Sequence, residues 1–563
     1  MRRLLMKRTT LLLFSALFFW SCAPTANTAD NTNSAYDVVV RNGTVYDGSG
    51  SEGFIADVAI SGDRIAKIGP KLSGKGKKEI DAAGMAVTPG FINMLSWAFN
   101  SLLRDGLSQS DIRQGVTLEV FGEGNSPGPL SDAMKSEMLD WNSGDDSDIP
   151  WVTLGEALTH LENKGVSTNV ASFVGATTVR IHVVGYENRK ATPEEISEMQ
   201  ALVREAMEEG AVGLGSSLIY APADYADTDE LISLSKVVGE YGGRYISHMR
   251  SEDKDLLKAY GELERIAREA GVGAEIYHLK ASREPYWKLL DDLIDLVDKA
   301  REDGLDISAD MYTYNASSTG LTGVIPTWVQ EGGHEAWMAR MQDPVVRPRL
   351  MKDLEAELAV QPPEGILLVG FRNEKMGEKY VGMTLAEAAE ERGQAPADAL
   401  IDMVVEDDSR IQCVYFSMSE DNIRKKIALP WVAFCSDAGS VDPSWSTGMK
   451  HPRAYGSFIR VLGKYARDEG VITVGEGVRR LTSFPADNLK LKNRGRLKAG
   501  YYADVVVFDP ETIQDHATFR EPNQYSTGVD HVFVNGDHVL KEGEHTGATP
   551  GRFLKGPGYR ENP

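Results

Sequence analysis

Short apolar runs alternate with amphipathic, helix-length segments through the central part of the chain. One such segment, residues 193–209, is preceded by Thr192, with Glu195 three positions on, an arrangement typical of a capping box at a helix start. Repeated strand-helix units of this length predict an α/β fold built on a parallel (β/α)8 barrel. The eight expected strands are residues 86–92, 116–121, 168–174, 211–216, 244–248, 274–278, 305–310 and 431–436.

Both ends of the chain have a different pattern, in which short alternating strands are separated by glycine turns. Residues 36–86 and 490–560 are therefore expected to pair into one small β-sandwich domain, which leaves residues 87–489 for the barrel. Within the barrel region, residues 320–425 are too many for a single loop, and they contain a second capping box at Thr384. We interpret this stretch as a subdomain inserted over the barrel mouth.

The start of the chain has the composition of an export signal followed by a tether. A basic stretch at residues 2–8 precedes an apolar stretch at 11–20, which is too short to span a bilayer, and Cys22 follows shortly after. This arrangement resembles the lipobox of bacterial lipoproteins, so we expect residues 1–22 to form a lipoprotein-type signal peptide with lipid on Cys22. Residues 23–35 are then a flexible tether, and lipid alone attaches the protein to a membrane of the cell envelope. The alternative is a plain signal peptide in which the cysteine is coincidental.

Composition narrows the choice of partners. The 563-residue chain has 42% hydrophobic and 25% charged residues, which is ordinary for a globular protein with a sizeable core. Its formal net charge of -23 disfavours nucleic acid as a partner, and it requires any anionic substrate to meet a local cation. Cys413 and Cys435 lie in apolar runs, and we interpret them as buried free thiols in preference to a disulfide. The oligomeric state is left open.

Two histidines stand at the ends of successive predicted strands. His248 closes one strand, His278 closes the next, and Asp437 directly follows a later one. Because the C-terminal strand ends of a barrel form its active site, these three side chains are expected to converge. Two imidazoles beside a carboxylate suit a zinc ion that activates water for hydrolysis. The alternative is a pair of buried histidines with no part in metal binding.

Four residues near these strand ends are candidates for other roles. Asp437 is placed to accept a proton from the attacking water and return it to the leaving amine, or else it caps the next segment. Arg453 is a candidate clamp for a substrate carboxylate, because its fork matches two oxygens, or else it forms a surface salt bridge. Tyr220 and Tyr312 follow predicted strands, and the pattern does not distinguish aromatic packing from substrate binding.

Taken together, these motifs resemble the D-aminoacylase (N-acyl-D-amino-acid deacylase) family of the amidohydrolase superfamily, over residues 36–560. The resemblance implies that His248 and His278 bind zinc and that Asp437 is the acid and base. It also implies that Arg453, Tyr220 and Tyr312 bind the carboxylate of a small-molecule substrate. The motifs that carry it are Pro89-Gly90-Phe91-Ile92, Ser247-His248-Met249-Arg250, His278, Asp310-Met311-Tyr312-Thr313-Tyr314, Ser436-Asp437, His451-Pro452-Arg453-Ala454-Tyr455-Gly456-Ser457-Phe458 and Ala503-Asp504-Val505-Val506-Val507-Phe508.

The chain departs from the family pattern at two metal-ligand positions. The family has a His-x-His pair after its first barrel strand, where this chain has Leu95 and Trp97, so the resemblance argues against a second metal there. The family's cysteine ligand aligns with Gly124. Its neighbour Glu123 is the expected third ligand, with Glu119 as the alternative, and a Glu-His-His set is an accepted zinc combination. We therefore expect one divalent metal.

These observations predict a metal-dependent amidohydrolase that cleaves the amide bond of an N-acyl amino acid, with the D-enantiomer expected, or of a related dipeptide. Two alternatives remain open. The loss of the His-x-His pair is also compatible with a pseudoenzyme that binds a ligand without turnover. The same chemistry also suits a hydrolase of cyclic amides or lactones.

Overall fold

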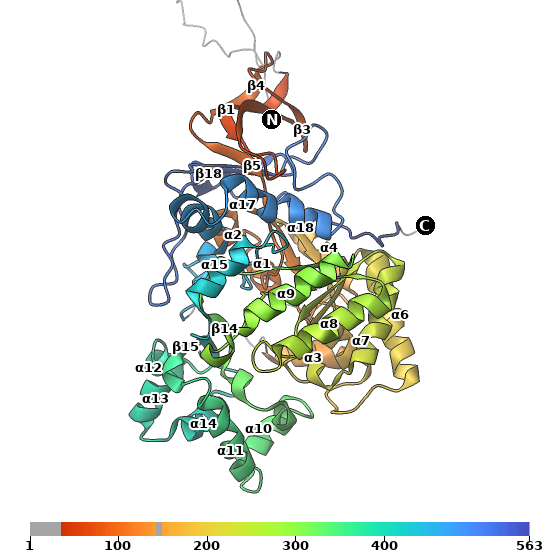
Figure 1. The fold of residues 1–563 in the computed structure, drawn as a ribbon, viewed down its shortest axis with the longest axis vertical. Coiled ribbons are helices and arrows are strands. Elements are labelled where there is room, and N and C mark those ends of the chain that lie inside the picture. The colour runs from red at the N-terminus through yellow and green to blue at the C-terminus, as the bar shows by residue number, and fades with distance from the viewer. Residues whose placement is uncertain (1–34, 142–148, 447, 562–563) are drawn as a thin grey trace, which may run out of the picture.

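The computed structural model describes residues 35–141, 149–446 and 448–561. Its centre is a parallel barrel of eight strands, which confirms the predicted fold class. Figure 1 shows helices such as α8 (Leu256–Ala270) and α9 (Leu289–Glu302) in front of this barrel. The eighth barrel strand, residues 431–436, closes the ring. Ala433 N donates to Ala309 O at 2.7 Å on one side, and Met94 N donates to Phe434 O at 3.3 Å on the other. The other seven barrel strands, with β8 and β9 counted as one interrupted strand, are β6 (Phe91–Asn93), β7 (Val116–Phe121), β8 (Asn169–Ser172) with β9 (Val174–Gly175), β10 (Gly213–Ser217), β11 (Arg244–His248), β12 (Gly273–Ile276) and β13 (Ile307–Ala309).

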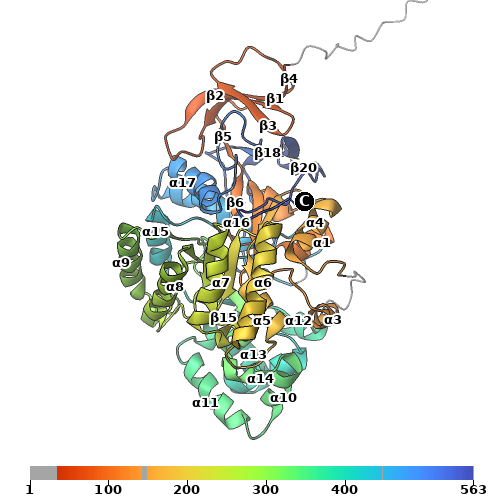
Figure 2. The same cartoon turned by 90° about the vertical axis from the view of Figure 1, so that its right-hand side faces the viewer.

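A row of amphipathic helices packs on the outside of the barrel (Figure 2). The capping box expected at Thr192 is present, with Glu195 N donating to Thr192 Oγ1 at 3.2 Å. Each helix buries one apolar face against the strands, as Leu263 and Ile266 do on α8. The helices of this row are α6 (Pro193–Glu209), α7 (Thr228–Glu240), α8 (Leu256–Ala270) and α9 (Leu289–Glu302).

The two ends of the chain meet in one small β domain at the top of Figure 1, as predicted. Its strands form a single hydrogen-bonded sheet of nine strands, in which the C-terminal strand β17 pairs antiparallel with the N-terminal strand β5. Valines from both ends, such as Val58 and Val505, share its core. The strands are β1 (Tyr36–Val45), β2 (Phe54–Ser61), β3 (Arg64–Gly69), β4 (Gly76–Asp81), β5 (Ala86–Pro89), β17 (Val505–Phe508), β18 (Val529–Val534), β19 (Asp537–Lys541) and β20 (Glu544–His545).

The first predicted barrel strand, residues 86–92, is in fact two strands. Its first half is β5, which belongs to the β domain, and its second half is β6, which belongs to the barrel. The chain changes sheets at Gly90, where a Cβ atom would lie only 2.0 Å from Thr117 Oγ1. A second difference lies at the C-terminus, which was predicted to remain in the β domain. Val170 N donates to Arg552 O at 2.9 Å, so this end of the chain runs along the barrel strand β8.

The insertion forms a separate unit at the bottom of Figures 1 and 2, on the side of the barrel away from the β domain. It has its own apolar core, which includes Leu354, Leu400 and Cys413. Its sheet of three strands leads back to the barrel and lines the cavity described below. Its elements are β14 (Ser317–Gly320), α10 (His334–Gln342), α11 (Arg347–Leu358), β15 (Ile366–Gly370), α12 (Glu374–Tyr380), α13 (Leu385–Arg392), α14 (Pro396–Asp407) and β16 (Gln412–Tyr415).

Two further sequence predictions can be compared with the described residues. Cys413 and Cys435 are both buried free thiols, as expected. Among the helices that the structure describes, none combines the length and apolar character needed to span a bilayer. The predicted signal peptide, Cys22 and nearly all of the tether lie outside the described residues.

Candidate active site

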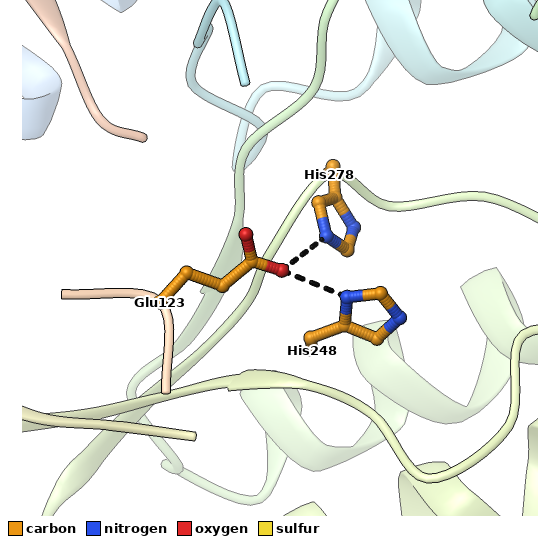
Figure 3. A group of neighbouring side chains, drawn as sticks. All are labelled: Glu123, His248 and His278. Atoms are coloured by element: carbon orange, nitrogen blue, oxygen red, sulfur yellow. Dashed lines mark hydrogen bonds and ion pairs between the residues drawn. The ribbon is translucent and has the colours of Figure 1, made fainter. Parts of the chain in front are cut away.

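Glu123, His248 and His278 meet at the mouth of the barrel, where β7, β11 and β12 end (Figure 3). Glu123 Oε1 lies 2.7 Å from His248 Nδ1 and 2.9 Å from His278 Nε2, and all three side chains are buried. The imidazole rings stand edge to face with centroids 4.4 Å apart. The structure thus brings together the two histidines expected from the strand ends and the glutamate expected from the family resemblance.

The chemistry of these three residues fits a zinc ion. One donor atom from each residue lies within 4.8 Å of the other two, and two imidazoles with one carboxylate leave room for water at zinc. His248 Nε2 is also buried without a hydrogen-bond partner. Burial raises the pKa of Glu123, but the positive charge of His278 and His248 outweighs it and holds that pKa well below its usual value. The third ligand is therefore an ionised carboxylate, as zinc requires.

Glu252 and Lys280 border this cluster, and sequence reasoning missed both. Glu252 Oε1 lies 3.1 Å from His278 Nδ1, and Lys280 Nζ lies 2.6 Å from both of these atoms. Burial and Lys280 lower the pKa of His278, yet Glu252 and Glu123 outweigh them and raise it to about 10, so the pocket favours added positive charge. A carboxylate on the free ring nitrogen orients a metal-binding imidazole. The available signal was position: Lys280 follows His278 by two residues, and Glu252 follows His248 by four.

Asp437 follows the eighth barrel strand and lines the same cavity as Glu123 and the two histidines. The backbone φ is 49° at Asp437 and 35° at His278, and positive values are uncommon for residues other than glycine. Both residues lie where a barrel strand ends and an active-site loop begins. Arg453 Nη1 lies 2.6 Å from Asp437 Oδ2, and Trp97 Nε1 donates to Oδ1 at 3.1 Å. Burial raises the pKa of Asp437; Arg453 opposes this effect and Glu123 adds to it. A raised pKa suits a carboxylate that holds a proton during part of a reaction.

The three predicted carboxylate-binding residues lie around one cavity of about 780 Å³. The Arg453 guanidinium lies 4.6 Å from the centroid of the Tyr312 ring, and the buried Arg453 Nε and Tyr312 hydroxyl have no hydrogen-bond partner. The Tyr220 ring lies 5.4 Å from that of His248, and its hydroxyl donates to Thr319 Oγ1 at 2.9 Å. Unpaired buried donors are costly, so these two atoms indicate where a ligand's oxygens bind.

The residues that replace family ligands have other contacts. Leu95 is buried in the apolar core, whereas Trp97 is 45% exposed at the cavity and contacts Asp437. Glu119, the alternative third ligand, is buried below the cluster, and its carboxylate accepts hydrogen bonds from Ser96, Ser108 and Thr168. It is not part of the Glu123 group.

The barrel, the zinc-compatible cluster and the neighbouring carboxylate define the class of metal-dependent barrel hydrolases. Comparison with known proteins agrees. Residues 78–540 match the model of the amidohydrolase family. The chain is 33% identical to D-aminoacylase of Alcaligenes xylosoxydans xylosoxydans, over 93% of this chain and 99% of that protein. It is 30% identical to N-acyl-D-glutamate deacylase of the same organism, over 92% and 96%.

A solved structure is also similar. The N-acyl-D-glutamate deacylase of Bordetella bronchiseptica, complexed with zinc and a phosphonate inhibitor, superposes with a TM-score of 0.77 at 27% identity, over 92% of this chain and 99% of that one. The chain belongs to the amidohydrolase family, within the group of D-aminoacylases and N-acyl-D-amino-acid deacylases. It is an amidohydrolase with a site that can hold a metal ion, and the resemblance found in the sequence is confirmed.

Proposed function

We propose that this protein hydrolyses the amide bond of N-acyl amino acids, with the D-enantiomer expected, and that it uses one zinc ion held by Glu123, His248 and His278. One observation carries the proposal: these three donors lie in the same cavity as Asp437 and Arg453. Similarity to proteins named D-aminoacylase and N-acyl-D-glutamate deacylase supports the substrate class.

The metal, when bound, would lower the pKa of the attacking water and polarise the scissile carbonyl. The protein's own residues handle the proton. The Asp437 carboxylate accepts it from the water and later donates it to the leaving amine, since its raised pKa allows both steps. Hydrogen bonds from Trp97 and Arg453 to its two oxygens hold the carboxylate in place.

The substrate's carboxylate binds at Arg453 and Tyr312 in this proposal. The Arg453 Nε and the Tyr312 hydroxyl are buried donors without partners, so a ligand carboxylate satisfies both. A local cation is needed here because the protein's net charge of -23 repels anions at long range. Tyr220 also lines the cavity, next to His248.

Metal analysis and turnover of the full-length chain test the proposal. We expect one zinc ion per chain and release of acetate from N-acetyl-D-amino acids. His248→Ala should lose the metal, whereas His531→Ala, in the β domain, should retain both metal and activity. Asp437→Asn should retain the metal and lose about 100- to 10,000-fold in kcat. Full zinc occupancy without turnover of acyl-D-, acyl-L- or cyclic substrates would reject the enzyme and favour a ligand-binding protein.

We also propose that the protein is exported and anchored in the bacterial cell envelope by lipid on Cys22. The basic and apolar stretches before Cys22 support this proposal. In bacteria that express the full chain, a palmitate analogue should label the protein and the protein should be found with membranes. Cys22→Ala should abolish both, and equal labelling of that variant would refute the anchor.

A further inference from the structure

One arginine on the cavity wall carries a charge that no carboxylate neutralises. Arg250 pairs with Glu262 at 2.9 Å, and Arg453 pairs with Asp437 at 2.6 Å. Arg410, which precedes β16 of the insertion, lines the same cavity without an ion pair to any described residue. Arg410 is an exposed residue at the mouth of this cavity, and an arginine without a carboxylate partner there suits an anionic ligand in a protein with net charge -23.

Although Arg410 is exposed, its guanidinium is hydrogen-bonded to the cavity wall. It donates to Thr322 Oγ1 at 3.2 Å and to Thr319 Oγ1 at 3.3 Å, and its guanidinium lies 5.2 Å from the centroid of the Tyr220 ring. Lys254 and Lys450 also line the cavity without a carboxylate partner, but the structure records no hydrogen bond that fixes either of them. A cation fixed before binding loses less conformational entropy when a ligand arrives.

Thr319 offers a second donor beside this guanidinium. A hydroxyl has one proton to donate and two lone pairs that accept. Thr319 Oγ1 accepts from Tyr220 and from Arg410, which occupies both lone pairs. Its own proton therefore remains free to donate, and Thr319 lines the cavity. Arg410 and Thr319 together present donors to an anion from one wall.

Arg410 and Arg453 contact neighbouring residues of β14. Arg453 Nη2 donates to Ser318 O at 3.3 Å, and Arg410 Nη2 donates to the next residue, Thr319, at the same distance. Adjacent residues on β14 are about 3.8 Å apart, so the two guanidiniums flank the same short stretch of strand. A ligand with two carboxylates a few bonds apart can reach both.

We propose that the cavity selects N-acyl derivatives of acidic amino acids, in which Arg453 binds the α-carboxylate and Arg410 with Thr319 binds the side-chain carboxylate. This proposal rests on the proposed function. It deepens that function by naming the substrate class. It also assigns specificity to the insertion, because Thr319 lies on β14 and Arg410 lies just before β16, and these two strands pair in the sheet of the insertion.

Paired substrates of equal size test the assignment. We expect a kcat/KM for N-acetyl-D-glutamate at least about 10-fold above that for N-acetyl-D-glutamine, since the two differ in charge and not in shape. Arg410→Gln should reduce kcat/KM for the acid by about 10- to 100-fold more than for the amide. Arg410→Lys should retain part of the preference. Arg349→Gln, which removes an arginine of the insertion that stacks on Trp328 outside the cavity, is the matched control and should change neither substrate.

Salt gives an independent readout. Raising the ionic strength should reduce the wild-type preference for the acid but should not reduce the acid-to-amide ratio of Arg410→Gln, because screening weakens the attraction to Arg410, which that variant lacks. If wild type hydrolyses the amide as fast as the acid, or if Arg410→Gln lowers both substrates equally, the subsite is refuted while the deacylase function stands. If no N-acyl amino acid is hydrolysed by zinc-loaded protein, both proposals fail.

Discussion

The indole N–H of Trp97 donates a 3.1 Å hydrogen bond to Asp437 Oδ1, while Arg453 holds the other oxygen of the same carboxylate. Trp97 occupies a position where the resembled family has a metal-binding histidine. In this chain that position therefore contacts the carboxylate that we assign to proton transfer. The contact links residues that are 340 positions apart in the sequence.

Trp97→Phe removes this donor and keeps the ring. Loss of a hydrogen bond to an ionised carboxylate destabilises the charged form, so the already raised pKa of Asp437 should rise by about one further unit. The acidic limb of the kcat/KM against pH profile should move up by that amount. Trp445→Phe is the matched control, because it breaks the 2.8 Å bond from Trp445 Nε1 to Asp105 away from the cavity lining. An unmoved limb in Trp97→Phe would mean that the indole only packs.

Zinc stoichiometry should be one per chain. Leu95 and Trp97 provide no ligand atoms for a second ion, so saturating zinc should give one bound ion by mass spectrometry. The double variant Leu95→His with Trp97→His restores the family pattern and should bind a second ion. Two ions in the unaltered chain would contradict this prediction. Thermal unfolding of the double variant checks that burying His at position 95 is tolerated.

Lys426 should destabilise the fold near neutral pH. Burial, and then the charge of Lys280, lower its pKa from 10.5 to about 7. Above pH 10.5 the lysine is neutral in both the folded and the unfolded state, so its protonation does not affect stability. As the pH falls from 10.5 to about 7, the unfolded chain binds the proton first, which lowers the stability of the folded state. Lys426→Met should therefore raise the melting temperature more at about pH 7 than at about pH 10. An equal gain at both values would show that the lysine is not buried uncharged.

Two glycines should respond in opposite ways to alanine. At Gly90, where the chain passes from β5 to β6, the added methyl would lie 2.0 Å from Thr117 Oγ1, so Gly90→Ala should cost about 1–3 kcal/mol. At Gly261, within α8, nothing lies within 4 Å of the added methyl, so Gly261→Ala should stabilise the protein by about 0.5–1 kcal/mol. Chemical unfolding monitored by circular dichroism measures both, and a neutral Gly90→Ala would contradict the close approach.

Local patterns in the chain were enough for much of the architecture. The strands that lead to His248 and His278 are short segments bounded by glycine turns, and the start of α6 is set by Thr192 and Glu195, so these elements follow from residues close together in the sequence. The choice between Glu119 and Glu123 did not follow, because both lie close to the end of the same strand. Only the assembled barrel separates them, by directing one carboxylate to hydroxyls and the other to imidazoles.

Periodicity and capping are properties of residues close together in the chain, and they specified the βα repeat, the β-rich ends and the strand-end histidines. The bond between Trp97 and Asp437, the meeting of Arg410 and Arg453 at β14, and the change of sheet at Gly90 depend on the closed barrel and its insertion. Each joins segments that are distant in sequence. Their approach depends on how many side chains pack at once, which no local pattern encodes.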